Sequence, residues 1–442
     1  MSNFFNDNVL LSNNTALKIY SEVKNLPIID YHCHLNQHMI KADDKFEDIG
    51  ALWLAGDHYK WRAMRMCGVD EYYITGNASF HDKFIKYAEI VPMIPGNPLY
   101  YWTHMELKQI FGIDKPLNKN TAEEIYNEAN LKLKDLSVRK LLKHFGVDVI
   151  CTTDDPVDDL LSHGTYDGIQ VRPTFRPDKL YLLEEDYLQR LGKVAGVNVD
   201  TLEGLLKAVA NRLDYFVAHG CKISDHGFNE FPSRYISFDE AKEIYANRAN
   251  LTPQMKEDFF GFLLVWLTKE YKKRNLVVQL HFSVIRNNNE VMFKKCGVDS
   301  GFDLIGKQSV IQNIILYLNQ VSDDERPEIV LYTLNDANLA ELSCVTGAFR
   351  HVRMGAAWWF NDTLRGIRRN LEIISEYSAL GTSFGMLTDS RSFSSYARFD
   401  FFRRILSNYL GELVESGEYD IEAAKSVAYN ICYGNIKNQF GL

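Results

Sequence analysis

The sequence predicts an α/β protein that folds as a closed (β/α)₈ barrel of the TIM type. Eight short runs rich in β-branched and aromatic residues follow one another along the chain, and stretches with the apolar spacing of helices separate most of them. Alternating strands and helices build parallel sheets, and eight such units close into a barrel. The glycine-rich phosphate loop that often follows the first strand of an open, doubly wound sheet is missing from the sequence.

The eight predicted strands extend in order from the N-terminal region to residue 387. They are Pro27–His32, Val147–Thr153, Ile169–Phe175, Gly220–Ser224, Leu276–His281, Glu328–Leu334, His351–Ala357 and Thr382–Leu387. Helical spacing of apolar residues is clear at Phe259–Leu267 and at Val310–Leu316, before and after the fifth strand.

The gap between the first two strands, residues 36–146, is too long for a simple crossover. It carries helical patterns at Asp48–Leu54, Lys83–Ile90, Ala122–Leu133 and Val138–His144. We therefore expect a single barrel domain over residues 1–442, with residues 36–146 as a helical insertion after the first strand. Residues 176–219 form a second, smaller helical excursion.

Composition excludes several classes of protein. The 26 Phe and 24 Tyr supply enough apolar surface for a packed core, which argues against disorder. No run approaches the roughly 18–20 apolar residues of a membrane span. The N-terminus lacks the features of a signal peptide, so we expect a cytoplasmic protein. The seven scattered cysteines contain no CxxC pair, which is typical of reduced, buried thiols rather than of a disulfide framework or a cysteine zinc site.

The formal net charge of −9 argues against nucleic-acid binding, because an acidic surface repels phosphate backbones. It permits a small acidic substrate, which needs only a locally basic pocket.

Metal-ligating residue types gather where barrel strands end, which is where such barrels form their active sites. His32 and His34 follow the first strand and are separated by one residue, so their imidazoles project to the same side. His281 ends the fifth strand, and Asp389 follows the eighth. A lone buried His is more often a core group than a ligand. The combination favours a metal site, and zinc suits these ligands.

This pattern of His-x-His, His and Asp resembles the amidohydrolase superfamily of metal-dependent barrels. The chain departs from it at two places. The sixth strand ends in Asn335-Asp336 instead of His, and Lys222 lies three residues before Asp225 at the end of the fourth strand. Both departures favour one metal rather than two and weaken the case for hydrolysis.

A closer resemblance covers nearly the whole chain in order. The segments that resemble the uronate isomerase (glucuronate isomerase) family are Ile29–Leu35, Gly56–Arg65, Gly96–Tyr100, Thr152–Pro156, Arg176–Lys179, His219–His226, Arg286–Asn289, Trp358–Asp362 and Leu387–Phe393. The resemblance implies an aldose–ketose isomerase of hexuronate catabolism. Its reactions interconvert D-glucuronate with D-fructuronate and D-galacturonate with D-tagaturonate, by proton transfer from C2 to C1 through a cis-enediol.

The same resemblance, together with the needs of this reaction, implies roles for the site residues. One divalent metal, expected to be Zn²⁺, binds the sugar acid and is held by His32, His34, His281 and Asp389. Asp389 starts proton removal at C2, and Tyr59 moves a proton between the C1 and C2 oxygens.

Further residues are implied as substrate contacts. Arg391 and Arg176 supply planar forks for carboxylate and hydroxyl oxygens. His58 and Asp225 contact or orient the substrate, and Trp358 and Trp359 line the sugar pocket.

Structural alternatives stay open for four of these residues. Tyr59 can be a helix-face aromatic, Arg391 a brace for the helix after the eighth strand, Asp225 a helix N-cap, and Trp358 a packing residue. A hydrolase of the same superfamily and a non-catalytic sugar-acid binding protein are the alternative functions. The sequence leaves open the preferred epimer and whether the exposed helices support a homo-oligomer.

Overall fold

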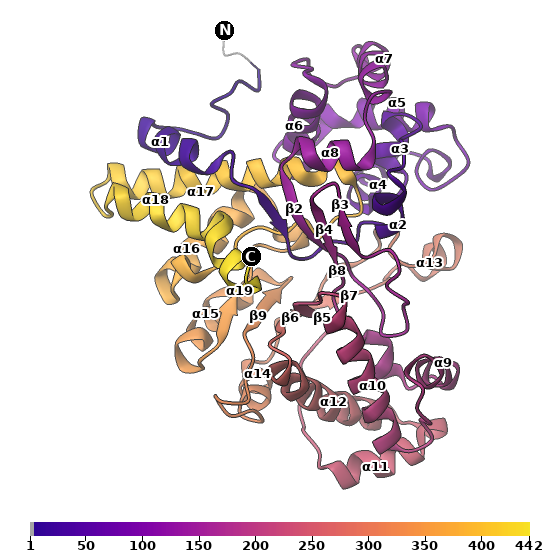
Figure 1. Cartoon of the computed structure of the whole chain (residues 1–442). Coiled ribbons are helices and arrows are strands. Elements are labelled where there is room, and N and C mark those ends of the chain that lie inside the picture. The colour runs from indigo at the N-terminus through magenta and orange to yellow at the C-terminus, as the bar shows by residue number, and fades with distance from the viewer. Residues whose placement is uncertain (1–3) are drawn as a thin grey trace.

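The computed structural model describes residues 4–442 and contains parallel strands that alternate with helices (Figure 1). The strands are β1 (Ile28–Asp30), β2 (Val147–Cys151), β3 (Gly164–Tyr166), β4 (Ile169–Arg172), β5 (Ile223–Gly227), β6 (Val277–Phe282), β7 (Val284–Ile285), β8 (Leu304–Ile305), β9 (Ile329–Thr333) and β10 (Val352–Met354). The α/β prediction is confirmed.

The parallel strands lie beside one another in chain order. β1 pairs with β2 and β2 with β4, while β5 pairs with β6, β6 with β9 and β9 with β10, all in parallel. Phe175 joins the two groups, because it bridges Asp154 on one side and Ser224 on the other. This order, with each strand next to its successor, is the one that a (β/α)₈ barrel requires. Every residue of β6 and β9 is buried, as expected for strands covered on both faces.

The eighth predicted strand, Thr382–Leu387, is wrong as a regular strand. Residues 380–382 form a short 3-10 helix, and no strand is assigned between residues 383 and 392. Gly385 has a φ of +69°, and a Cβ there would lie 2.2 Å from the Ile431 carbonyl oxygen. Asp389 is also left-handed, with a φ of +45°. Gly385 therefore interrupts the extended backbone that the predicted strand needs, and Asp389 does the same two residues after its end.

The segment still lies where the eighth strand was expected, against the end of β1. The Thr388 amide donates to Asp30 Oδ1 at 2.9 Å, and the Thr388 hydroxyl donates to Asp30 Oδ2 at 2.6 Å. The Asp389 amide donates to the His32 carbonyl at 3.1 Å, and the His34 amide donates to the Ser390 carbonyl at 2.9 Å. A buried carboxylate and two backbone bonds thus join the eighth position to β1.

The helices surround these strands. They are α1 (Asn14–Val23), α2 (Gln37–Ala42), α3 (Ile49–Leu54), α4 (His58–Met66), α5 (Phe80–Ile90), α6 (Pro98–Phe111), α7 (Ala122–Leu133), α8 (Val138–His144), α9 (Glu185–Ala195), α10 (Leu202–Ala218), α11 (Phe238–Ala246), α12 (Pro253–Lys273), α13 (Glu290–Cys296), α14 (Ile311–Leu318), α15 (Leu339–Ala348), α16 (Leu364–Tyr377), α17 (Ala397–Glu415), α18 (Ile421–Tyr429) and α19 (Asn435–Phe440).

Helices α2–α8 lie between β1 and β2 in the chain, and α3, α5, α7 and α8 occur where the helical patterns were found. Helices α3–α7 gather on one side of the strands, whereas α9–α12 gather at another end (Figure 1). α1 packs closely against α17 at Gly411. A Cβ at this position would lie only 2.7 Å from the Ala16 amide nitrogen, so the close approach requires glycine. The division into one domain with an insertion at 36–146 stays a prediction.

One irregular segment between β6 and α14 reaches α4. Strands β7 and β8 pair in antiparallel fashion and enclose α13. Arg62 of α4 donates through Nη1 to the carbonyls of Gly301 and Asp303, at 3.1 and 3.0 Å. We call residues 284–305 the β7–β8 segment.

The junction between Asp30 and Thr388 generates a prediction about stability. Replacing Thr388 by Val keeps the shape of the side chain but removes a buried donor to Asp30. We expect Thr388→Val to lower the free energy of unfolding by about 1–3 kcal/mol, measured by urea denaturation. The control is Thr382→Val, at an exposed position where the hydroxyl donates to the Ala379 carbonyl. Equal effects of the two variants would show that the junction does not stabilise the fold.

Candidate active site

A cavity of about 320 Å³ opens where the parallel strands end. Its lining residues are His32, His34, His58, Thr153, Arg176, His281, Arg286, Asp299, Trp358, Trp359, Asp389 and Arg391. Most of these residues come from different strand ends, so the cavity lies at the carboxyl-terminal face of the strands, where barrels of this type place their chemistry.

A larger cavity of about 500 Å³ lies elsewhere, between the N-terminal residues and α17. Lys108 there pairs with Asp7 at 2.8 Å, and Arg404 pairs with Asp400 at 3.0 Å. The His and Asp clusters described below lie outside this larger cavity. The smaller cavity is therefore the candidate site.

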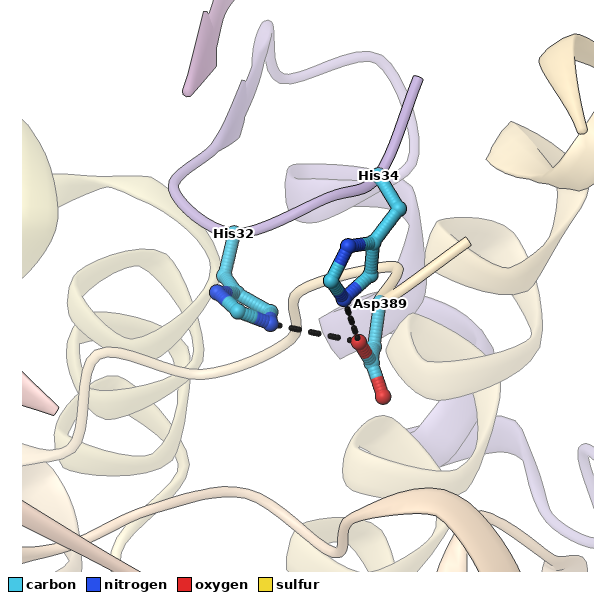
Figure 2. A group of neighbouring side chains, drawn as sticks. All are labelled: His32, His34 and Asp389. Atoms are coloured by element: carbon cyan, nitrogen blue, oxygen red, sulfur yellow. Dashed lines mark hydrogen bonds and ion pairs between the residues drawn. The ribbon is translucent and has the colours of Figure 1, made fainter. Parts of the chain in front are cut away.

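Three predicted metal ligands, His32, His34 and Asp389, lie together, and both histidines approach the same carboxylate oxygen of Asp389 (Figure 2). His32 Nε2 and His34 Nε2 each lie 3.2 Å from Asp389 Oδ1. One ligand atom from each of the three residues lies within 4.8 Å of the others. The imidazole nitrogens and the carboxylate oxygen are donors that suit Zn²⁺.

The charge states of this group also suit a cation. Burial lowers the pKa of His34 to about 4, which keeps its imidazole neutral. Burial by itself raises the pKa of Asp389, but the hydrogen bonds from His32 and His34 hold it well below its ordinary value. The carboxyl is therefore an anion at neutral pH, and an anionic oxygen is a suitable ligand for a cation.

His281 belongs to an adjoining group with His32 and Asp225. Its Nδ1 lies 2.7 Å from Asp225 Oδ1, and its ring stacks on Tyr332 with 4.4 Å between ring centres. Its Nε2 is buried and has no hydrogen-bond partner among residues 4–442. An imidazole held through one nitrogen by a carboxylate, with the other nitrogen free, is the usual arrangement of a metal-ligating His.

Asp225 lies inside β5, so its interpretation as a helix N-cap is wrong. It is fully buried, and its Oδ2 lies 2.9 Å from Arg176 Nη1. Burial raises the pKa of Asp225, but the charges of Arg176, His32 and His281 hold it well below its ordinary value. Arg176 also donates through Nε to Asp178 Oδ2 at 2.8 Å. Asp225 thus orients His281 and Arg176 together.

Arg391 and His58 line the opposite part of the cavity. Arg391 Nη2 lies 2.8 Å from Asp299 Oδ2. His58 is the first residue of α4, which begins there because Asp57 Oδ1 accepts from the Tyr59 and Lys60 amides. Burial and the charge of Arg391 lower the pKa of His58 to about 4, so its ring is neutral at the cavity wall.

Trp358 does more than pack. Its indole Nε1 donates to Asp389 Oδ2 at 2.9 Å. The two histidines contact the other carboxylate oxygen, Oδ1, so both oxygens have partners. Its ring also lies 4.7 Å from that of His281. Trp358 therefore links the two His and Asp groups.

Tyr59 lines a smaller adjoining cavity of about 100 Å³ rather than the main one. His58 and Trp359 line both cavities and separate them. Burial and the negative charge of Asp389 raise the pKa of Tyr59 well above its ordinary value, so the phenol is neutral. Tyr59 thus lies beside the space that the other predicted residues surround.

The sequence matches a known family over nearly its whole length. The glucuronate isomerase family matches residues 1–440. The chain belongs to the glucuronate isomerase family. A uronate isomerase from Lachnospira eligens is 41% identical over all of this chain and 99% of its own length. The crystal structure of uronate isomerase from Thermotoga maritima has a TM-score of 0.96 at 35% identity and covers 99% of both chains. That of glucuronate isomerase from Caulobacter crescentus has a TM-score of 0.94 at 25% identity and covers 99% of this chain and 97% of its own.

Membership of the glucuronate isomerase family confirms the resemblance drawn from the motif segments. Nothing in residues 4–442 forms a helix long and apolar enough to cross a membrane. The roles assigned to individual side chains stay predictions, although most of them line one cavity.

Several cavity residues of this glucuronate isomerase family member were not predicted as site residues. Arg286 and Asp299 come from the β7–β8 segment, which follows no strand-end pattern. Thr153 ends a predicted strand, so its position was a usable signal. Trp359, by contrast, was expected at the sugar pocket together with Trp358, and it lines the cavity with its ring 5.9 Å from the Arg286 guanidinium.

Asp362 generates a prediction about pH. Its carboxyl is 5% exposed and its Oδ1 has no hydrogen-bond partner in the described chain. Burial raises the pKa of Asp362 to about 7, against the opposing charge of Arg398. The pKa of Asp362 is higher in the folded protein than in the unfolded chain. Its contribution to the free energy of unfolding therefore falls as pH rises from about 4 to about 7.

We expect Asp362→Asn to remove this loss. The gain in free energy of unfolding over the wild type should be small at pH 4, grow up to pH 7 and then level off. Urea denaturation across that range measures it, with the exposed Asp324→Asn as the control. A gain that does not vary with pH would contradict the raised pKa.

Proposed function

We propose that this protein isomerises hexuronates, converting aldohexuronates such as D-glucuronate or D-galacturonate into the corresponding ketohexuronates. The observation that carries the proposal is a single cavity where a His and Asp cluster faces two guanidinium groups, in a chain of the glucuronate isomerase family. The histidines and aspartate are suited to acid–base and metal chemistry, and Arg176 and Arg391 are suited to an acidic sugar.

The reaction defines what the site must do. A proton leaves C2 and another arrives at C1, while the two oxygens exchange carbonyl and hydroxyl roles. This needs a base near carbon, a group that both donates and accepts at oxygen, and a partner for the carboxylate.

His32, His34, Asp389 and the free Nε2 of His281 would hold one divalent metal, and we propose Zn²⁺ from the ligand types. When bound, such a metal supplies positive charge and a fixed template for the oxygens of the sugar acid. The unpartnered, buried Nε2 of His281 supports this assignment.

Asp389 is the proposed base at C2. Its low pKa keeps it deprotonated, and the indole of Trp358 fixes Oδ2 at 2.9 Å. Its backbone is held in place by the bond from its amide to the His32 carbonyl. The carboxylate is therefore fixed in both orientation and charge before the substrate arrives.

Tyr59 is the proposed proton carrier between the C1 and C2 oxygens. Because its phenol stays neutral, the O–H can donate to one oxygen while its lone pairs accept from the other. The neutral ring of His58, between Tyr59 and the main cavity, can hold a sugar hydroxyl.

Arg176 and Arg391 are the proposed contacts to carboxylate and hydroxyl oxygens. Arg176 is held rigidly by Asp225 and Asp178, whereas Arg391 pairs with Asp299 at the more exposed part of the cavity. A cytoplasmic location and a homo-oligomeric state stay predictions from the sequence.

The proposed activity is tested by incubating the purified protein with D-glucuronate and, separately, with D-galacturonate. We expect ketose formation and exchange of the C2 proton with solvent. Asp389→Asn should lower kcat by roughly 10²–10⁴-fold, because general-base catalysis contributes about that much.

The matched control is Asp336→Asn, which changes an exposed aspartate after β9 that pairs with Arg369. It should leave turnover unchanged. If the wild type neither isomerises nor exchanges with metal supplied, the isomerase proposal is wrong. Hydrolysis or tight binding without turnover would then favour the alternative functions.

Metal binding has a readout independent of activity. We expect elemental analysis to find about one divalent metal per chain, and added Zn²⁺ to raise the thermal midpoint of chelator-treated protein. His32→Ala should abolish that rise, whereas His81→Ala, at a surface pair with Glu123, should not. A rise that persists in His32→Ala would place the metal elsewhere.

A further inference from the structure

The Arg398 guanidinium is buried against two aromatic rings behind the cavity. Arg398 lies in the first turn of α17 and is 1% exposed. Its Cζ lies 3.9 Å from the ring centre of Trp102 and 5.0 Å from that of Tyr59. Its Nη1 donates to the Thr388 carbonyl at 3.1 Å.

An ion pair does not explain this burial. No carboxylate of the described residues lies within 4.0 Å of Arg398, and its Nε has no hydrogen-bond partner there. Of the nearby acidic groups, Asp57 binds Lys60 at 2.6 Å and Glu106 accepts from Ser394 at 2.6 Å. Asp362 is buried near Arg398 but makes no direct ion pair with it. Burying a charge without an ionic partner is costly, and the contacts with the rings and the Thr388 carbonyl offset only part of that cost. The position of Arg398 therefore needs a functional explanation.

The carbonyl that Arg398 binds is itself fixed. Thr388 is held by both carboxylate oxygens of Asp30, and Asp389 is held by its amide bond to the His32 carbonyl. Removing Arg398 would therefore leave the Asp389 backbone anchored. The Tyr59 ring, in contrast, would lose the flat group that supports it.

We propose that Arg398 is a positioning residue that holds the Tyr59 ring in a fixed place relative to Asp389. Its guanidinium donates a hydrogen bond to the Thr388 carbonyl, next to Asp389, and lies over the Tyr59 ring. It therefore sets the distance between Asp389, the proposed base, and Tyr59, the proposed proton carrier. The inference rests on the proposed function, because it gives Tyr59 a part in the reaction. Arg398 acts through Tyr59 and contacts no reacting atom.

The first test compares substitutions at Arg398. We expect Arg398→Met to lower kcat by about 10–100-fold with KM changed less than about threefold, because small displacements of a catalytic group are costly. Arg398→Lys keeps the charge but loses the planar stack, and should lie between Arg398→Met and the wild type.

The matched control is Arg403→Met. Arg403 lies on the same helix, is 4% exposed and likewise donates to backbone carbonyls, those of Lys24 and Leu26, but it lies away from the cavity. Its substitution should lower the thermal midpoint and leave kcat unchanged. Equal losses of kcat at Arg403 and Arg398 would mean that burial alone explains the effect.

A double-mutant cycle separates positioning from general damage. In a Tyr59→Phe background, where the phenol is already lost, Arg398→Met should lower kcat by less than about twofold. The same fold-loss in both backgrounds would overturn the proposal. If Arg398→Met does not fold, Arg398→Lys enters the cycle with the same two outcomes. A wild type without isomerase activity overturns the proposed function instead, which is a distinct result.

Discussion

The Asp30 carboxylate joins two parts of the chain that are 358 residues apart. It accepts from both the amide and the hydroxyl of Thr388, and this places the next residue, Asp389, beside His32 and His34. Burial favours the protonated form of such a carboxyl and raises the pKa of Asp30 to about 6, although the Thr388 bonds oppose this shift. Because the eighth position of the barrel has no regular strand, these bonds replace the ladder that would otherwise align it with β1.

The remainder of the site is a set of buried charges that orient one another. Asp225 contacts His281 and Arg176 and lies 3.9 Å from His32, so one carboxylate orients two side chains and places its charge beside a third. Isolated buried charges would be costly, but a connected group offsets that cost and restricts each side chain to one orientation. The left-handed backbone of Asp389 is a further cost, since a non-glycine residue is strained there. The surrounding hydrogen bonds hold the residue in this conformation.

Much of the fold was accessible from the sequence, because strands and helices leave local patterns. Buried runs such as β6 and β9 are rich in β-branched and aromatic residues, and His281 near the end of β6 lines the cavity. The eighth strand failed because the pattern of its residues matches a strand, whereas Gly385 and Asp389 adopt left-handed backbone that only their packing reveals. Arg286 lies in one of the segments that resemble the family but was given no role, and Asp299 was missed because the β7–β8 segment has no periodic pattern.

The sequence by itself determined the fold class, the family and the residue types at the strand ends, since all of these are written in local order. Only the tertiary structure decided which atoms meet. It placed His281 with Asp225 rather than directly on Asp389, brought Arg398 beneath Tyr59, and put Tyr59 in an adjoining cavity. The physical reason is that these distances depend on the packing of segments hundreds of residues apart, where buried polar groups must find partners that no short-range pattern specifies.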